Sequence, residues 1–386
     1  MTSYLRALRL VNFRNYADDT VLLKPGLNVV VGDNAQGKTN LLEAGAFAVT
    51  GSSPRTTNDP EVVRWGADFA RIEARIATEG SGQERKVAVG YAPGQKKRLT
   101  VDGAPAPSLA SYAAGGAGVR AVNFFPDDIR IVKGAPSDRR EFLDGLLSTL
   151  RPSYARATGE YAKAVQQRNQ LLRRIRDGFS SERTLSTWDR KVVDLGEQLL
   201  RGREEAMPVL DEHFASSLRA LYGPEKAAVR YSYSVTPDEY AEALREAHGA
   251  DIERGATSVG PHRDDFEVSL GGVDLITFGS QGQQRLATLA LKFAARDHVR
   301  GATGEDPILL FDDVMSELDG RRREFLAGYF LESTQAVIST TNLEYFGEEI
   351  LRRAQVIRIS GGAVMETTTD GVAERVAEQR DSFRTA

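Results

Sequence analysis

The sequence predicts a two-lobed α/β protein in which a mostly helical lobe interrupts a mixed sheet with flanking helices. Three observations lead to this prediction. An apolar strand, Leu27–Val31, is followed by a glycine-rich loop and a helical pattern. Long helical patterns fill the middle of the chain, and the strand-and-turn pattern returns from Thr257. We place the first lobe at residues 1–140 and 255–386, and the helical lobe at residues 141–254.

The other elements follow from local periodicity and turn residues. Strands are predicted at Ala70–Ala77, Lys86–Tyr91, Arg98–Val101, Val119–Phe125, Phe266–Leu270, Ile308–Phe311, Ala336–Ser339, Val356–Ile359 and Val364–Thr367. Helices are predicted at Thr39–Ala48, Tyr154–Ile175, Leu185–Leu221, Gln283–Val299 and Gly320–Phe330, with a helical break at Asp177–Ser181. The polar tail after Gly371 is predicted to fray.

The composition is that of a globular protein without cysteine. Of 386 residues, 41% are hydrophobic and 27% charged, which argues against wholesale disorder. No apolar run could cross a bilayer and no secretory signal pattern begins the chain, so we expect a cytoplasmic protein without a membrane partner. The absence of cysteine excludes thiolate catalysis. A net charge of −4 excludes a globally basic nucleic-acid binder, but not a basic patch.

A phosphate-binding loop is the strongest chemical signal. Residues 32–39 read Gly-Asp-Asn-Ala-Gln-Gly-Lys-Thr, a complete G-x-x-x-x-G-K-[ST] motif. Its backbone N–H groups and the following helix N-terminus suit a phosphate. Lys38 would bind the β- and γ-phosphates of ATP, and the Thr39 hydroxyl would ligate Mg²⁺. The residues assigned to the nucleotide here are Gly32, Asp33, Asn34, Ala35, Gln36, Gly37, Lys38, Thr39 and Asn40.

Two carboxylates end the apolar strand Ile308–Phe311. Ligands of open α/β sheets bind at the carboxyl ends of strands, so we assign Asp312 to Mg²⁺, directly or through water. Asp313 is placed to orient or deprotonate the attacking water. Alone, the pair would fit a turn or helix cap better than a metal site, but the phosphate loop favours the metal interpretation.

The order of four motifs resembles the ATP-binding-cassette (ABC) superfamily. After the phosphate loop come Ser280-Gln-Gly-Gln, then Asp312-Asp313, then Ser316–Asp319. Without this order of motifs, Ser280 would be interpreted only as the N-cap of an apolar helix. The resemblance implies that Ser280, Gly282 and Gln283 contact the γ-phosphate held by an opposite subunit, with Ser280 and Lys38 joining Asp313 in catalysis. ATP would then be a dimerising ligand.

Within the superfamily, the chain resembles the RecF family. The segment between Lys38 and Ser280 is longer than in transporter ATPases and lacks the long heptad repeats of chromosome-structural ATPases. The matching stretches are Leu10–Tyr16, Gly32–Glu43, Phe125–Asp128, Lys133–Arg140, Gln167–Asn169, Val259–Asp265, Ser280–Arg285 and Leu310–Asp319.

This resemblance implies an ATP-dependent DNA-binding protein of recombinational gap repair, replication restart and the SOS response. It implies an ATP-driven homodimer that clamps double-stranded DNA or its junction with single-stranded DNA. A slow, DNA-stimulated ATPase activity would release the clamp, and RecO and RecR would be partners in loading RecA.

Further site residues follow from the resemblance by position. Arg14 and Asn15 would meet the nucleotide. Residues 340–342 would occupy the switch position, where many superfamily members have histidine. Asp313 replaces the usual glutamate, which offers a reason for slow hydrolysis. The glutamine loop would lie near residues 124–128.

Two basic segments are candidate DNA contacts. The segment Arg130–Arg176 carries eleven Lys and Arg against four Asp and Glu. Such a surface would bind phosphates in a salt-sensitive, sequence-tolerant way, unless it is a solvated helical face. Lys96–Arg98 is a second candidate or an exposed hairpin turn. His262 follows Gly-Pro in a loop and is assigned no chemistry.

Three other classes remain as alternatives. An ATPase subunit of a transporter is disfavoured by the long insertion and its basic helices. A chromosome-organising, SMC-like ATPase would need a much longer coiled coil. A monomeric P-loop kinase or hydrolase is disfavoured by the Ser280 signature.

Overall fold

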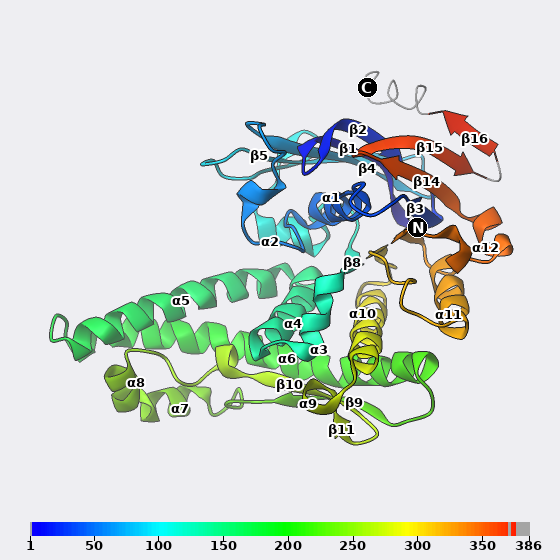
Figure 1. Cartoon of the computed structure of the whole chain (residues 1–386). Helices are drawn as coiled ribbons and strands as arrows, with labels where there is room; N and C mark the ends of the chain where they lie inside the picture. Colours follow the sequence, from blue (N-terminus) through cyan, green and yellow to red (C-terminus); the bar gives the residue numbers. More distant parts are fainter. Residues whose placement is uncertain (1, 370–371, 376–386) are drawn as a thin grey trace. The chain divides into compact units, whose positions relative to one another are not determined.

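The computed structural model describes residues 2–369 and 372–375, and the chain divides into two compact units (Figure 1). The first unit comprises Met1–Asp128 and Val299–Ala386, and the second comprises Ile129–His298. These limits differ from those predicted for the two lobes. Strand β9 (Ala227–Ser232) pairs with β10 (Asp265–Leu270), so the chain beyond residue 255 stays with the helices. Ser280 therefore lies in the second unit.

The first unit contains a mixed sheet that carries the phosphate loop. Its described strands are β3 (Gly26–Val31), β8 (Ala121–Phe124), β12 (Ile308–Phe311), β13 (Gln335–Thr340), β14 (Gln355–Ser360), β15 (Ala363–Thr369) and β16 (Val372–Arg375). They run in the order β16-β15-β14-β3-β13-β12-β8. The strands from β14 to β8 are parallel, and β15 and β16 extend the sheet antiparallel. The predicted strands Val356–Ile359 and Val364–Thr367 are thereby confirmed as β14 and β15.

A second, antiparallel sheet belongs to the same unit. Its described strands are β1 (Ser3–Phe13), β2 (Tyr16–Leu22), β4 (Ala70–Thr78), β5 (Glu84–Tyr91), β6 (Arg98–Val101) and β7 (Ala104–Pro105), in the order β2-β1-β4-β5-β6-β7. The predicted strands that match β4, β5 and β6 are confirmed. Of the tail predicted to fray, residues 372–375 instead form β16, and the residues after them lie outside the described part.

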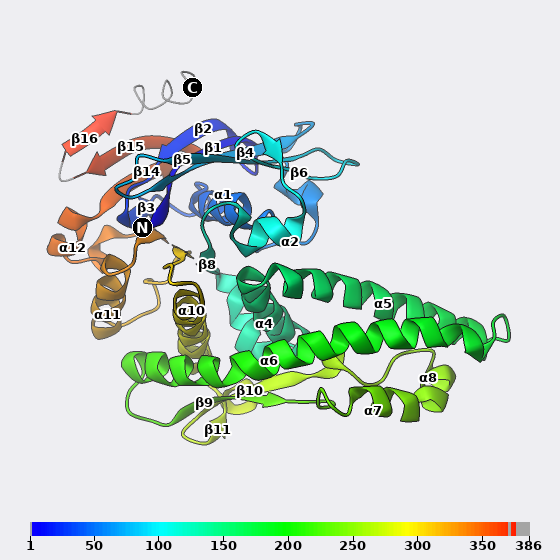
Figure 2. The ribbon, with the colours of Figure 1, turned by 180° about the vertical axis from the view of Figure 1, so that it is seen from behind.

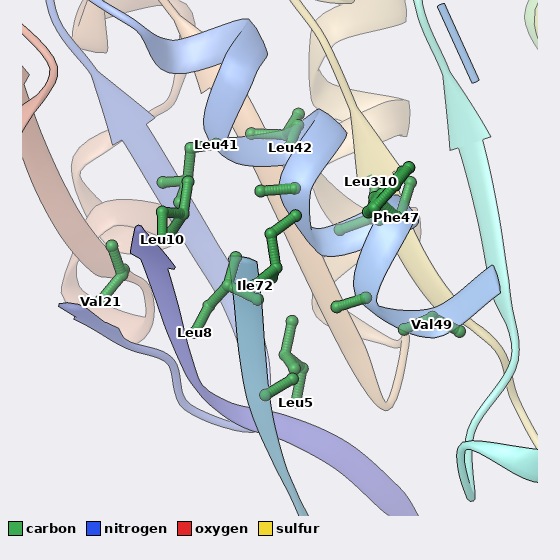
Figure 3. Packing of buried hydrophobic residues seen from close by; sticks show 14 of the residues in the cluster. Leu5, Leu8, Leu10, Val21, Leu41, Leu42, Phe47, Val49, Ile72 and Leu310 are labelled. Carbon is green, nitrogen blue, oxygen red and sulfur yellow. The ribbon is translucent and has the colours of Figure 1, made fainter. Parts of the chain in front are cut away.

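Helix α1 (Lys38–Thr50) packs between the two sheets. Figure 3 shows Leu41 and Phe47 of this helix between Leu8 of the antiparallel sheet and Leu310 of the mixed sheet. A helix covered on all sides should be apolar on all sides, and the sequence Leu-Leu-Glu-Ala-Gly-Ala-Phe-Ala-Val has this character. The core thus fixes the start of α1, where the phosphate loop ends.

The opposite face of the mixed sheet is covered by α11 (Gly320–Leu331). Leu310 faces α1, whereas the ring of the next residue, Phe311, contacts that of Phe330 in α11 at 5.2 Å between centroids. Neighbouring strand residues point to opposite faces, so the sheet is covered on both sides. Two short helices complete this unit, α2 (Leu109–Ser111) and α12 (Glu348–Arg353).

The second unit is mostly helical, as predicted. Its helices are α3 (Arg130–Lys133), α4 (Pro136–Leu150), α5 (Pro152–Arg176), α6 (Ser186–Leu221), α7 (Tyr240–Glu246), α8 (His248–Arg254), α9 (Leu275–Phe278) and most of α10 (Gln281–Thr303). Strands β9, β10 and β11 (Val273–Asp274) form a small sheet. The predicted break at Asp177–Ser181 is confirmed, because it separates α5 from α6.

Buried arginines join the helices of the second unit. Arg168 is fully buried and binds Asp251 at 2.6 Å and Asp189 at 2.7 Å. Arg203 is likewise buried and binds Asp144 at 2.9 Å. Buried charges require such partners, so these residues serve the interior of the unit.

The loop histidine also serves the interior. Nδ1 of His262 lies 2.7 Å from the Tyr161 hydroxyl, and Nε2 lies 3.1 Å from the Thr257 carbonyl oxygen. Burial lowers the pKa of His262. These contacts give His262 a structural role, and no catalytic role was predicted for it. Across the described part of the chain, no helix combines the length and hydrophobicity that a membrane span requires.

Candidate nucleotide-binding site

The phosphate loop needs its two glycines for different reasons. Gly37 has a φ of 114°, a conformation that side chains disfavour, and a Cβ there would lie 2.7 Å from Nδ2 of Asn15. Gly32 has an ordinary backbone conformation, but a Cβ there would collide with the carbonyl oxygen of Ile359. The loop is therefore shaped by its own backbone and by the segment packed beside it.

The lysine of the loop folds back over the loop itself. Nζ of Lys38 donates to the carbonyl oxygens of Gly32 at 2.7 Å and Asp33 at 2.8 Å. Burial lowers the pKa of Lys38, while Asp312 and Asp313 oppose that effect. The ammonium group thus lies at the centre of the loop, where a phosphate would offer it charged acceptors instead.

Thr39 and Asp312, which were both assigned to Mg²⁺ from the sequence, lie in contact. Oγ1 of Thr39 donates to Oδ2 of Asp312 at 2.8 Å, and Oγ of Ser339 donates to Oδ1 at 2.5 Å. Asp312 is buried, and burial raises its pKa, whereas the two hydroxyl hydrogen bonds act to lower it.

These oxygens fit a magnesium ion. Mg²⁺ is bound in nucleotide sites by one or two protein oxygens together with substrate phosphates and water. A carboxylate and a hydroxyl in contact supply that donor set. Among the residues that the structure describes, no cluster of three or more His, Asp or Glu side chains suits a metal ion, so the phosphates would have to complete this site.

Asp313 adopts an unusual backbone conformation beside Asp312. Its φ is 46°, its N–H donates to Oγ of Ser339 at 3.0 Å, and its Oδ2 accepts from Oγ of Ser316 at 2.9 Å. Residues other than glycine rarely adopt positive φ values. Where such residues occur at functional sites, the surrounding structure holds the backbone in this conformation. Ser339 contacts both aspartates through one oxygen.

Ser339 was not among the predicted site residues. It was assigned only to the end of a strand, yet β12 and β13 are parallel neighbours, with Phe311 beside Ile338. Consecutive parallel strands end at the same edge, so the residues after Phe311 and Ile338 should meet. The signal was present but required knowing the strand order.

The predicted switch and glutamine-loop segments lie at this same sheet edge. Thr340 follows Ser339, and its hydroxyl exchanges hydrogen bonds with the backbone of Asn342. The carbonyl oxygen of Phe124 accepts from the N–H of Asp312 at 2.8 Å. Residues 124–128 themselves contain no glutamine.

Arg14 is bound to a buried glutamate. Its Nη2 and Nε donate to the Glu43 carboxylate at 2.6 and 3.0 Å. Ser53 Oγ at 2.6 Å and Arg55 Nη1 at 2.8 Å donate to the same carboxylate, which is completely buried in α1. Glu43 was not among the predicted site residues, because nothing in an apolar helix pattern indicates its partners.

Asn15 contacts the phosphate loop directly. Its Nδ2 donates to the carbonyl oxygen of Gln36 at 3.2 Å, and its Oδ1 accepts from Asn40 at 2.8 Å. Asn40 in turn accepts from Arg55 at 3.0 Å. Gln36 also accepts from the N–H of Gly362 at 2.9 Å, so the β14–β15 turn supports the loop.

Ser280 caps α10 in the second unit. Its Oγ accepts from the N–H of Gln283 at 3.3 Å, and Gln283 returns a bond to the N–H of Ser280 at 2.9 Å. Gln283 also donates to the Tyr222 hydroxyl at 3.0 Å. A Cβ on Gly282 would meet nothing within 4 Å, so this backbone is open to a close approach.

The basic segments are only partly available to DNA. In Arg130–Arg176, Arg139 and Arg168 are buried in ion pairs, and Arg140 donates to the Asp264 carbonyl oxygen. The remaining eight basic residues are exposed, namely Arg130, Lys133, Arg151, Arg156, Lys163, Arg173, Arg174 and Arg176. In the other segment, Lys97 binds Asp59 at 3.0 Å.

Comparisons with known proteins agree with this geometry. The family model of the RecF/RecN/SMC N-terminal domain matches residues 4–360. The DNA replication and repair protein RecF of Acetivibrio thermocellus is 36% identical over 370 residues, which cover 93% of this chain and 99% of the relative. RecF of Heliobacterium modesticaldum is also 36% identical, covering 93% and 98%.

Solved structures give the same result. Two structures of the recombination mediator protein RecF in the RecFOR pathway, RecF-ATPrS and RecF-ATP, are 30% identical with a TM-score of 0.84. They cover 94% of this chain and 98% or 99% of the solved chains. The Smc head domain of Pyrococcus furiosus, at 15% identity and a TM-score of 0.56, shares the fold. The chain therefore belongs to the RecF/RecN/SMC N-terminal domain family, and within it to the RecF proteins of DNA replication and repair.

Proposed function

We propose that this chain is an ATP-dependent DNA-binding protein that uses ATP as a switch. The observation that carries the proposal is the contact of Thr39 with Asp312 beside the phosphate loop. It brings together the hydroxyl and carboxylate that a magnesium–nucleotide complex requires. The solved relatives are described with ATP and with ATPrS, which supports the same nucleotide here.

Each residue of the site has a separate role in this proposal. Lys38 would exchange its loop carbonyl acceptors for phosphate oxygens, and the loop N–H groups would bind the remaining oxygens. Bound Mg²⁺, held by Thr39 and Asp312, would neutralise phosphate charge. Asp313 would orient the attacking water, and its hydrogen bond from Ser316 would limit its strength as a base.

The switch requires a second copy of the chain. Ser280 and Gly282 are exposed, and their backbone is open, as a segment that contacts a partner's nucleotide would need. ATP bound between two copies would favour the dimer, because it contacts both, and loss of the γ-phosphate would remove that link. We propose that the ATP-bound dimer clamps DNA and that slow, DNA-stimulated hydrolysis releases it.

The cellular role follows from the family. We propose that the chain acts in recombinational gap repair, replication restart and the SOS response, with RecO and RecR as partners that load RecA. Double-stranded DNA and its junctions with single strands are the proposed substrates. The exposed basic residues of α3 and α5 supply sequence-independent phosphate contacts for this role.

One experiment tests nucleotide coupling and phosphate binding together. DNA affinity is measured by fluorescence anisotropy across a salt series with ATP, ADP and no nucleotide. We expect the tightest binding with ATP and a linear fall of log affinity with log salt. Equal affinity in the three nucleotide states would contradict the switch, and a flat salt series would contradict phosphate contact.

A further inference from the structure

The turn that follows α5 presents an aromatic ring to solvent. The N–H of Gly178 donates to the Ile175 carbonyl oxygen at 2.9 Å, and that of Phe179 donates to Arg174 at 2.7 Å. Gly178 has a φ of 77°, the left-handed conformation of a common helix ending. The apolar residue after such a glycine often packs back on its helix, but Phe179 is 76% exposed. Its backbone is thus held in place while its ring stays uncovered.

The position of this turn adds to its accessibility. Figures 1 and 2 both show the connection between α5 and α6 at the end of the helix pair, beyond α8. The loop reads Asp-Gly-Phe-Ser-Ser-Glu-Arg over residues 177–183, so Phe179 is its only apolar side chain. A surface for a protein partner would normally offer more apolar area around such a ring.

The acidic side chains of the loop are already paired. Asp177 accepts from Nε of Arg176 at 3.0 Å. A carboxylate oxygen of Glu182 lies 3.4 Å from Nε2 of His248. These contacts reduce the repulsion that a phosphate would otherwise meet at this place.

The neighbouring arginines keep unbalanced positive charge. Within residues 2–369 and 372–375, the guanidinium groups of Arg174 and Arg183 have no ion-pair or hydrogen-bond partner, and both residues are exposed. Arg173 donates only to the Gly255 carbonyl oxygen, at 3.3 Å. In the sequence, Phe179 therefore lies between two arginines whose charge is not neutralised by any contact within the described residues.

We propose that this loop, residues 177–183, binds unpaired nucleotides, with Phe179 stacked on a base and Arg174 and Arg183 beside its phosphates. Every base has a flat face, so stacking on an aromatic ring tolerates any sequence. Bases inside a duplex are already stacked, so the ring distinguishes single-stranded DNA from intact duplex. The inference rests on the proposed DNA-binding function and specifies which part of a DNA substrate this loop contacts.

The test compares two circular DNAs that lack ends. One is a closed duplex circle, and the other is the same circle with a short single-stranded gap, both labelled internally for anisotropy. Phe179→Ala should weaken binding to the gapped circle about tenfold, within the range for one stacked base, and change binding to the closed circle less than about twofold. Phe179→Tyr should retain the wild-type affinities.

A matched control uses another exposed aromatic residue. Trp65 of the first unit is 100% exposed, so Trp65→Ala removes an uncovered ring elsewhere and should leave both affinities unchanged. Equal losses by Phe179→Ala on the two circles, or no loss on either, would overturn the proposal. If the wild-type chain bound neither circle, the proposed DNA binding itself would fail.

An independent measurement reports contact at the ring. Trp65 and Trp188 are the only tryptophans in the sequence, so replacing both by Phe and introducing Phe179→Trp creates a single reporter. Stacking on a base should quench its fluorescence with the gapped circle and not with the closed circle. Identical spectra with the two circles would contradict stacking, even if the affinities differed.

Discussion

Replacing Glu43 by alanine should destabilise the first unit and weaken nucleotide binding together. The Glu43 carboxylate is completely buried and accepts four hydrogen bonds, of which three come from Arg14 and Arg55. The same arginine, Arg55, donates to Asn40, which contacts Asn15 beside the phosphate loop. Loss of the carboxylate should therefore loosen the loop as well as the core.

The size of the effect follows from burial. Removing one partner of a buried ion pair costs about 3–5 kcal/mol. The side chains of Arg14 and Arg55 remain 19% and 32% exposed, so water can replace part of what they lose. We therefore expect a loss of about 2–3 kcal/mol in the free energy of unfolding. Glu43→Gln keeps the volume but places an amide against two guanidinium groups, so it should recover only part of this loss.

The assay combines urea unfolding with titration of a fluorescent ATP analogue. A control, Glu84→Ala, removes a carboxylate that pairs at the surface with Arg6, whose side chain is 60% exposed, and should cost less than about 1 kcal/mol. An unfolding free energy for Glu43→Ala within about 0.5 kcal/mol of wild type would refute the reasoning, since that is the range of an ordinary surface change.

Other predictions address the nucleotide site. Lys38→Met should abolish ATP-induced dimerisation in sedimentation, and an unchanged dimer fraction would refute its role. Ser280→Arg should leave nucleotide binding by the monomer largely intact but block the dimer; loss of binding by the monomer would place Ser280 in its own subunit's site. Asp313→Asn should slow ATP turnover while preserving the ATP-bound dimer, and wild-type turnover would remove Asp313 from the mechanism. Burial raises the pKa of Asp312, so ionisation of this carboxyl lowers the free energy of unfolding. Asp312→Asn should thus stabilise the nucleotide-free protein at pH 7, and this gain should disappear as the pH falls below about 4, where the unfolded carboxyl is also protonated. A gain that persists at low pH in urea titrations would contradict this account.

Local sequence patterns predicted the elements around the phosphate loop closely. Strand β12 has the predicted limits, β3 begins one residue earlier than predicted, and α1 begins one residue earlier and ends two residues later. These segments are short, apolar and bounded by glycine or acidic residues, so nearby residues determine their structure. The Thr39–Asp312 contact could be predicted too, because both residues belong to motifs with known order.

The limits of the two units could not be predicted in this way. They depend on β9 pairing with β10 across more than thirty intervening residues. No local pattern specifies that pairing, and a sequence reading that ends the helical lobe at residue 254 separates the two strands. Ser280 was consequently predicted in the first lobe, whereas it lies in the second compact unit, where it caps a helix as its sequence context suggested.

Composition also overstated the basic surface of the helical segment. Counting charges between residues 130 and 176 gave equal weight to Arg168, which is fully buried, and to Arg174, which is exposed. Arg168 is distinguished by its partners Asp189 and Asp251, which lie 21 and 83 positions later in the chain. Charge runs therefore indicate an amount of positive charge, while tertiary structure decides how much of it reaches solvent.

The strand order explains why Ser339 belongs to the site. Strand β13 lies between β3, which leads to the phosphate loop, and β12, which ends at Asp312. The carboxylate of Asp312 must therefore reach past β13 to meet Thr39. A serine at the end of β13 is small enough to leave that path open, and its hydroxyl holds Oδ1 of Asp312 so that Oδ2 points to Thr39. Because the same oxygen accepts from the N–H of Asp313, the middle strand also fixes the turn in which Asp313 has a positive φ. One residue thus positions both carboxylates, for which we propose separate roles toward Mg²⁺ and the attacking water.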